Sequence, residues 1–311
     1  MKTVLHIGAH RTGTTTFQSY LSRQKTPLLA QGVASWGPTI TRKGLFSGIS
    51  QPTPATRNSA MGRARGRLAL RREKIKWEQG VHTLVVSEEN IMGSMARNLR
   101  RARLYDDVGE RVARFVAAFG DRVDHVVLSI RSLDHYWASV ASHCVARGHA
   151  VPDRARLSQI AASRRSWRDV ITDISCAAPD AHIEVLPFER FAGRPDALMA
   201  AILQNPAPRD TGKNWLNRRP DLPTLRRALS DRGEVAETLR GSDNRWTPFT
   251  PAEVADLRET YADDMFWLIS GAGGLATVTE DLDRTEAEWP TGSLTRGQPD
   301  DKQERRMAQP R

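Results

Sequence analysis

Four short apolar runs along the chain have the composition of buried strands. They are rich in β-branched and other apolar residues and are not interrupted by glycine. The runs are residues 4–7, 81–87, 123–129 and 182–187. Each is long enough for a strand and too short for a helix of ordinary length.

Amphipathic segments follow most of these runs. In residues 107–119, Val108, Val112, Phe115 and Phe119 recur at the three- and four-residue spacing of one helix face. The predicted helices are residues 14–24, 63–79, 107–119, 155–176 and 195–203. Alternation of strands and helices predicts an α/β fold in three layers, with a central, mostly parallel sheet covered on both faces.

Two stretches depart from this alternation. Residues 35–60 are rich in Gly, Pro, Ser and Thr and are predicted to be a long loop, a type of segment that is often functional. With the basic helix after it, this loop forms an insertion over residues 35–80 where an acceptor could bind. Residues 285–311 are polar with few apolar side chains, so we expect a disordered tail after a single domain of residues 1–284.

The chain is strongly basic. Its 311 residues include 46 Lys and Arg against 36 Asp and Glu, for a formal net charge of +10. Arginines cluster in residues 63–72, 97–103 and 164–165. Such runs suit an anionic partner such as an acidic glycan or a lipid headgroup, although a solvated helix face is their usual explanation. No zinc knuckle, helix-turn-helix or RNP-type motif is present, so nucleic acid is not the expected partner.

Compartment and cysteine use fit an intracellular enzyme. No apolar stretch reaches eighteen residues, and the first predicted strand leaves no room for a signal peptide, so a cytoplasmic protein without a transmembrane helix is expected. Cys144 and Cys176 lack metal-ligand spacing and are expected to be small buried residues. The oligomeric state is left open.

The first predicted strand runs into the loop Gly8-Ala9-His10-Arg11-Thr12-Gly13-Thr14-Thr15-Thr16. Two glycines five residues apart, followed by Thr hydroxyls, favour a loop that wraps a phosphate at a helix N-terminus. The lysine of an ATPase P-loop is missing, because Thr14 takes its place and the cation lies inside the loop at Arg11. The expected ligand is therefore a nucleotide without a γ-phosphate, although a tight turn with no ligand is the simpler alternative.

This loop resembles the phosphosulfate loop of bacterial sulfotransferases, whose donor is 3′-phosphoadenosine 5′-phosphosulfate (PAPS). Their pattern is close to H-x-G-x-x-K-T-G-T-T-x-x-Q, and the matching positions here are His6, Gly8, Arg11, Thr12, Gly13, Thr14, Thr15 and Gln18. Arg11 stands where the family usually has Lys. The resemblance implies a P-loop NTPase-like fold of the sulfotransferase type.

A second pair of residues extends the resemblance. Arg131 ends the predicted strand 123–129, and Ser139 follows eight residues later in the next helix. The family uses an Arg and a Ser at this spacing to bind the donor's 3′-phosphate, where the guanidinium forms a bidentate fork. Considered alone, the pair is better explained by Arg131 as a helix cap and Ser139 as an ordinary small helix residue.

Carboxylates follow the predicted strand 81–87. Glu88 and Glu89 stand at its carboxyl end, where ligands collect in open α/β sheets. The family has a base near this place that deprotonates the acceptor, and its pattern favours Glu89 over Glu88. Helix capping is the alternative for either residue. His10 and His135 are weaker candidates for the base.

The resemblance implies sulfuryl transfer from PAPS to a hydroxyl, most simply of a carbohydrate or glycolipid, with 3′-phosphoadenosine 5′-phosphate (PAP) as the product. Glu89 and Arg11 would be catalytic, and no metal would be required. The donor would contact Arg11, Thr12, Gly13, Thr14, Thr15, Thr16, Arg131 and Ser139. Lys213 and Arg218 are weaker candidates for a loop that closes over the 3′-phosphate.

Two other functions stay open at this stage. One is a degenerate P-loop kinase that uses ATP and Mg²⁺ on a small acceptor. The other is a non-catalytic protein of the same fold that binds a nucleotide or an anionic polymer.

Overall fold

The structure is a computed structural model that describes residues 1–49, 57–212, 215–236 and 239–279. Lys213 and the predicted tail 285–311 lie outside the described residues. Residues Met1–Thr279 form one compact unit.

A six-stranded sheet lies at the centre of this unit. Its strands are β1 (Lys2–His6), β2 (Val33–Trp36), β3 (Thr83–Ser87), β4 (His125–Ile130), β5 (His182–Pro187) and β8 (Thr277–Val278). They are arranged in the order β2-β3-β1-β4-β5-β8, and every neighbouring pair is parallel. The predicted α/β fold with a parallel sheet is therefore confirmed. A separate antiparallel pair joins β6 (Gly241–Ser242) and β7 (Arg245–Trp246).

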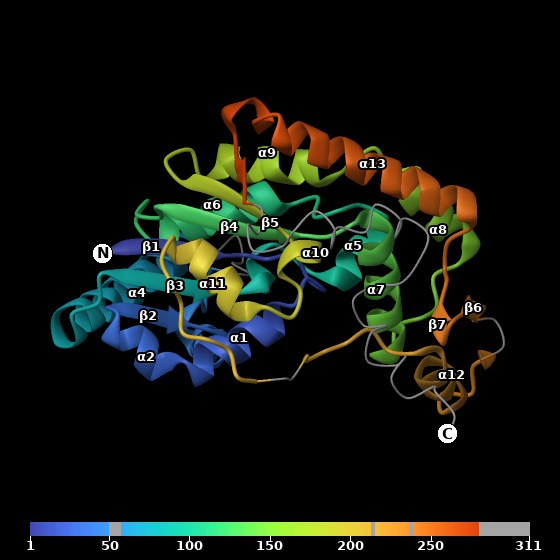
Figure 1. The fold of residues 1–311 in the computed structure, drawn as a ribbon, viewed down its shortest axis with the longest axis horizontal. Helices are drawn as coiled ribbons and strands as arrows, with labels where there is room; N and C mark the ends of the chain where they lie inside the picture. The colour runs from blue at the N-terminus through green and yellow to red at the C-terminus, as the bar shows by residue number, and fades with distance from the viewer. Residues whose placement is uncertain (50–56, 213–214, 237–238, 280–311) are drawn as a thin grey trace, which may run out of the picture. The chain divides into compact units, whose positions relative to one another are not determined.

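Helices and short helical turns connect the strands (Figure 1). The longer helices are α1 (Thr14–Arg23), α4 (Arg57–Gln79), α6 (Val108–Ala118), α7 (Leu133–Ala146), α8 (Arg154–Ala161), α9 (Trp167–Ala177), α11 (Pro195–Leu203), α12 (Leu222–Ser230) and α13 (Pro251–Ile269). The shorter ones are α2 (Lys25–Ala30), α3 (Pro38–Ile40), η1 (Thr41–Leu45), η3 (Glu89–Ile91), α5 (Met95–Arg101), α10 (Phe188–Phe191) and η5 (Ala272–Gly274). Among the described residues, no helix combines the length and the apolar character needed to cross a bilayer.

Alternate residues of the strands pack on opposite faces of the sheet, which gives two cores. Val4 and Val85 face a smaller core that includes residues of α1, α2 and α11. Leu5 and Val86 face a larger core with residues of α4, α6, α7 and α9. In Figure 1, α1 and α2 lie below the sheet, and α9 and α13 lie above it. Burial on both faces explains why β3 and β4 appear in the sequence as continuous apolar runs.

Three differences from the predicted elements have local causes. β2 overlaps the start of the region predicted as a loop. Its sequence contains no apolar run, because Ala34 and Ser35 stand between the buried Val33 and Trp36. The predicted helix 155–176 is two helices, because the Ser166 side chain caps a new helix start at Trp167. The C-terminal third, which carries no readable pattern, adds α12, α13 and the short edge strand β8.

The strand order places a topological switch point at the centre of the sheet. The connection from β1 leads toward β2 on one side, whereas the connection from β4 leads to β5 on the other. Ligands of open α/β sheets bind in the crevice where neighbouring connections diverge in this way. The ends of β1 and β4, with β3 beside β1, are therefore where a site is expected.

Candidate functional site

The loop between β1 and α1 has a backbone that depends on its glycines. Gly13 adopts φ +79° directly before the first turn of α1, a left-handed conformation that favours glycine. Gly8 lies so close to His6 that an added Cβ would meet the ring Nε2 at 3.1 Å. Arg11 also has a positive φ of 69°, which is strained for a residue with a side chain. The loop delivers the N-terminus of α1, where the first backbone N–H groups have no partner within the helix.

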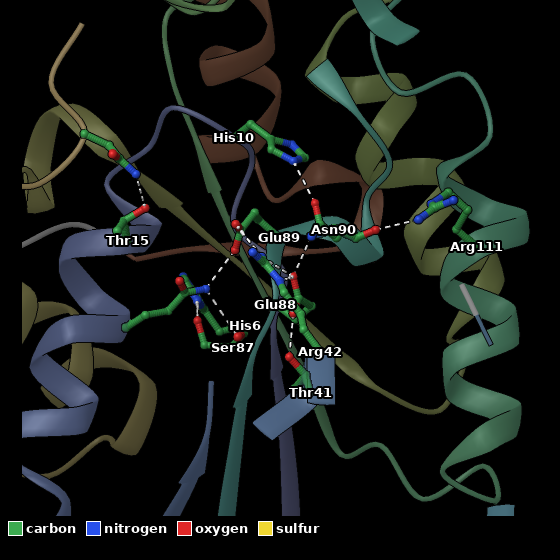
Figure 2. Close-up of polar contacts among 12 residues, drawn as sticks. His6, His10, Thr15, Thr41, Arg42, Ser87, Glu88, Glu89, Asn90 and Arg111 are labelled. Carbon is green, nitrogen blue, oxygen red and sulfur yellow. Dashed lines mark hydrogen bonds and ion pairs between the residues drawn. The ribbon is translucent and has the colours of Figure 1, made fainter. Parts of the chain in front are cut away.

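The threonines of the loop differ in their partners. Thr12 donates to the carbonyl of Ala9 at 2.5 Å. Thr15, labelled in Figure 2, accepts through Oγ1 from Asn217 Nδ2 at 2.9 Å. Thr16 Oγ1 accepts from the backbone N–H of Leu216. The Thr14 hydroxyl is buried and has no hydrogen-bond partner among the described residues. A buried hydroxyl of this kind at a helix N-terminus is suited to an anionic oxygen.

Arg11 extends from the loop toward α7. Its guanidinium donates to Ser139 Oγ at 3.0 Å, to His143 Nδ1 at 3.2 Å and to the carbonyl of Asn217 at 2.8 Å. Burial, and then the nearby Arg131, lower the pKa of Arg11 to about 10, so it stays charged at neutral pH. Burial and the charge of Arg11 lower the pKa of His143 to about 4, which leaves its ring neutral and able to accept. The structure thus brings Arg11 and Ser139 into direct contact.

Arg131 lies beside the same loop. Its side chain is 7% exposed, donates to the Arg11 carbonyl at 3.2 Å and lies over the Phe188 ring at 4.6 Å. The carbonyl of Arg131 accepts from the Trp167 indole, which fixes the end of β4. Arg11, Arg131 and Ser139, predicted from two separate motifs, therefore lie together at the carboxyl ends of β1 and β4.

Arg219 is a third arginine at this place and was not predicted. It donates to Ser142 Oγ at 3.0 Å and to the Trp246 carbonyl. Burial and then the charges of Arg131, Arg245 and Arg11 lower its pKa to about 9. The basic sequence around residue 218 indicated a binding segment, but the neighbouring candidate Arg218 instead lies over the Trp215 ring at 5.6 Å. Sequence could not distinguish two adjacent arginines that point in different directions.

The two glutamates at the end of β3 have different surroundings (Figure 2). Glu88 is 3% exposed, accepts from Thr41 Oγ1 at 2.5 Å and pairs with Arg42 at 2.6 Å. Glu89 is less buried, accepts from Gln18 at 2.7 Å and forms a second ion pair with Arg42 at 2.8 Å. Burial would raise the pKa of Glu89, but hydrogen bonds from its own backbone, Gln18 and Arg42 outweigh burial, and the pKa is lowered.

These contacts separate the roles of the two carboxylates. Glu88 also accepts from the backbone N–H of Asn90 and so caps the turn η3, which matches the capping alternative. Glu89 lies nearer the surface and contacts Gln18 of α1, so it is the carboxylate on the loop side of the sheet edge. Arg42, from the predicted loop 35–60, was missed because nothing in the sequence around it indicates a partner.

Two histidines lie close to this edge. His6 is buried, contacts Ser87 Oγ at 2.9 Å through Nδ1, and burial lowers its pKa to about 4. His10 is 7% exposed and contacts the Tyr105 hydroxyl at 2.8 Å. His135 instead contacts Asp134 at 3.3 Å, on α7.

The two cysteines differ in burial. Cys144 is buried, as predicted, and burial raises its pKa to about 11. The prediction for Cys176 was wrong, because this side chain is exposed on α9. Among the described residues, no group of three or more His, Cys, Asp or Glu side chains is arranged to hold a metal ion.

Comparison with protein-family models, curated proteins and solved structures finds no match to this chain. Its function is therefore inferred from the side chains and their geometry.

Proposed function

We propose that this protein is a sulfotransferase that moves a sulfuryl group from PAPS to an acceptor hydroxyl, on a P-loop NTPase-like fold of the sulfotransferase type. One observation carries the proposal. The phosphate-type loop after β1, the Arg131–Ser139 pair after β4 and Glu89 after β3 come from distant parts of the sequence and meet at neighbouring strand ends. That is the arrangement that the resemblance implies.

The residues at this edge fit a donor with two phosphate groups. The buried Thr14 hydroxyl and the N-terminal N–H groups of α1 suit the 5′-phosphate, together with Thr12, Gly13, Thr15 and Thr16 of the same loop. Arg131, Ser139 and Arg219 suit the 3′-phosphate. Neighbouring arginines that lower one another's pKa repel one another, and a bound dianion would relieve that repulsion.

The segment that carries Asn217 lies over the donor loop. It contacts Thr15, Thr16 and Arg11, and Arg219 follows two residues later. We propose that this segment closes over the bound donor. The sequence had suggested Lys213 and Arg218 for that role. Arg11 now donates to Ser139, so donor binding would insert a phosphate between these two groups or shift Arg11 toward the 5′-phosphate.

In the proposed reaction Glu89 accepts the proton of the acceptor hydroxyl, a role that contributes roughly 10²–10⁴-fold. The donor supplies the sulfuryl group, whose S–O bond to the 5′-phosphate breaks as the acceptor oxygen bonds to sulfur. Arg11 stabilises the negative charge that grows on the departing phosphate, as cationic groups do in phosphoryl transfer. Because the pKa of Arg11 stays near 10, it acts through its charge and not as a proton donor.

Glu89 is ionised but paired in this state. Arg42 lowers its pKa, which keeps the carboxylate ready to accept a proton but weakens it as a base. An acceptor that displaces Arg42 would raise the pKa of Glu89 and strengthen it. Arg42 lies in the insertion 35–80, which supports our proposal that the acceptor, a carbohydrate or glycolipid hydroxyl, binds on this side.

Calorimetric titration of the purified full-length chain with PAP, compared with ATP and Mg²⁺, tests this function. We expect micromolar binding of PAP. Arg131→Ala and Arg219→Ala should each weaken it by roughly 10- to 100-fold, since each removes a charged hydrogen bond to phosphate. Arg218→Ala is the matched control and should change the affinity less than twofold, because Arg218 lies over Trp215.

Other results would assign another function. A preference for ATP with Mg²⁺ would favour the kinase. A non-catalytic binding protein would bind PAP but transfer no sulfuryl group in a broad acceptor screen. Its donor binding would also be unchanged by Glu89→Gln.

A further inference from the structure

A chain of buried hydrogen bonds ends at His10, inside the donor loop. Asn98 Nδ2 donates to the Tyr136 hydroxyl at 2.9 Å, and Tyr136 hydrogen-bonds to Tyr105. The Tyr105 oxygen lies 3.0 Å from the backbone N of His10 and 2.8 Å from its ring Nδ1. Asn98 of α5 and Tyr136 of α7 thus hold Tyr105, which precedes α6 and contacts His10 in the loop.

The contacts of the two ring nitrogens of His10 show which one carries the proton. Nε2 faces Asn90 Oδ1, which can only accept, so the single proton of a neutral ring belongs on Nε2. Nδ1 is then unprotonated and accepts from the Tyr105 hydroxyl at 2.8 Å. Burial lowers the pKa of His10, so the ring is neutral and its single proton is on Nε2.

The Nε2–H group points to the edge that the reaction would use. Its contact is Asn90 Oδ1 at 3.5 Å, a long distance for a hydrogen bond, and Figure 2 shows His10 directed toward Asn90 beside Glu89. The imidazole is 7% exposed and is adjacent in sequence to Arg11. It thus presents a donor between the loop that would hold the 5′-phosphate and the carboxylate that would activate the acceptor.

We infer that the His10 Nε2–H group is a subsite for the sulfuryl oxygens of the donor, with Tyr105 as the residue that positions it. This inference rests on the proposed function. A sulfuryl group in transfer lies between the 5′-phosphate and the acceptor oxygen, and its three outer oxygens are anionic acceptors. A donor locked in one tautomer loses little on meeting them, because its orientation is already set by packing.

His10 is therefore assigned a role that PAP binding alone does not reveal. PAP has the same two phosphates as PAPS but lacks the sulfuryl group. If Nε2–H contacts only that group, removing it weakens PAPS and leaves PAP unchanged. If His10 merely supports the loop, the affinities for both ligands fall together.

The experiment compares PAPS with PAP by calorimetry, without acceptor, on the full chain. His10→Leu keeps the volume of the side chain, and the backbone N–H still reaches Tyr105. We expect PAPS affinity to fall about tenfold or more and PAP affinity to stay within twofold, because one hydrogen bond to a charged group is lost. His10→Gln is the matched variant that keeps an N–H donor, and it should restore most of the difference.

Nitrogen NMR of the His10 ring tests the positioning role of Tyr105 separately. In the unaltered chain we expect a protonated Nε2 and an unprotonated Nδ1. In Tyr105→Phe the two tautomers should mix, and PAPS should lose affinity relative to PAP. A protonated Nδ1 in the unaltered chain, or equal loss of both ligands in His10→Leu, would overturn the inference. Failure of the unaltered chain to bind PAP would instead reject the function on which the inference rests.

Discussion

The carboxyl ends of β3 and β4 carry opposite charges, and the partners of these charges differ. At β3, Arg42 forms ion pairs with both Glu88 and Glu89, so one cation offsets part of the charge of two carboxylates. At β4, Arg11 and Arg219 are held by hydroxyl, imidazole and carbonyl acceptors, and the nearby arginines lower their pKa. The first edge has its ion pairs within the protein, whereas at the second we propose that an anion relieves the repulsion among the arginines.

This difference shows that buried charges in one protein can serve two purposes, stabilising the fold or binding a ligand. A buried carboxylate that has its partner contributes to holding the chain together, because removing it leaves polar groups without partners. Arginines that lower one another's pKa repel one another, and under the proposed function a bound anion would relieve that repulsion. The two edges should therefore respond differently to substitution and to pH.

The largest expected effect is on the carboxylate edge. Glu88→Ala leaves the buried Thr41 hydroxyl and the Asn90 N–H without this acceptor and removes one of the two carboxylates that pair with Arg42, so we expect a loss of about 3–5 kcal/mol in the free energy of unfolding. Glu89→Ala is the matched control and should cost only about 1 kcal/mol, since its side chain is more exposed. Denaturant unfolding measures both. Equal losses would show that the two carboxylates do not differ as their contacts indicate.

The second effect is a loss of folding stability at acid pH, caused by His6 on β1. His6 has a folded-state pKa of about 4 against the usual 6.5, so the folded chain binds fewer protons than the unfolded chain between these values. Stability is then fully present above pH 6.5 and is lost as pH falls toward 4, by about 3 kcal/mol from His6 alone. His6→Asn should flatten this part of the profile of unfolding free energy against pH. An unchanged slope in the variant would remove His6 as the cause.

The smallest effect concerns the arginine edge at alkaline pH. Because the pKa of Arg219 is about 9 and that of Arg11 about 10, both lose charge as pH rises through these values. We expect PAP affinity to fall roughly tenfold between pH 7.5 and pH 10, while the protein stays folded. The Arg219→Ala variant should show a weaker dependence. Binding that is constant over this range would mean that neither arginine meets the ligand as we propose.

Much of the fold was predictable because burial on both faces leaves a simple trace in the sequence. β3, β4 and β5 are apolar runs of the right length, and α6 has regular helical spacing. β2 and β8 were not predictable. Only two of the four residues of β2 are buried, and β8 has two residues at the sheet edge. The capping box of Ser166 and Asp169 is a sequence signal that could have split the predicted helix 155–176.

Several site residues could be predicted for a similar reason. Gly13 and the threonines form a local motif that can be identified from a few residues. Arg131 and Ser139, eight residues apart on one strand end and one helix, were expected from the resemblance to sulfotransferases. Arg42 reaches the candidate site from a segment without a pattern. Asn217 and Arg219 lie in a basic segment that the sequence indicated, but no local rule distinguishes Arg219 from Arg218.

The sequence by itself determined the parallel sheet and the phosphate-type loop after its first strand, because apolar periodicity and glycine placement act over a few residues. Only the tertiary structure decided which glutamate is more deeply buried, which of two adjacent arginines lies near Arg11 and Arg131, and which partner each ring nitrogen of His10 meets. Those outcomes depend on contacts between residues that are distant along the chain, such as Thr41 with Glu88 and Tyr105 with His10. The strand order brings these partners together, and no single segment contains the information.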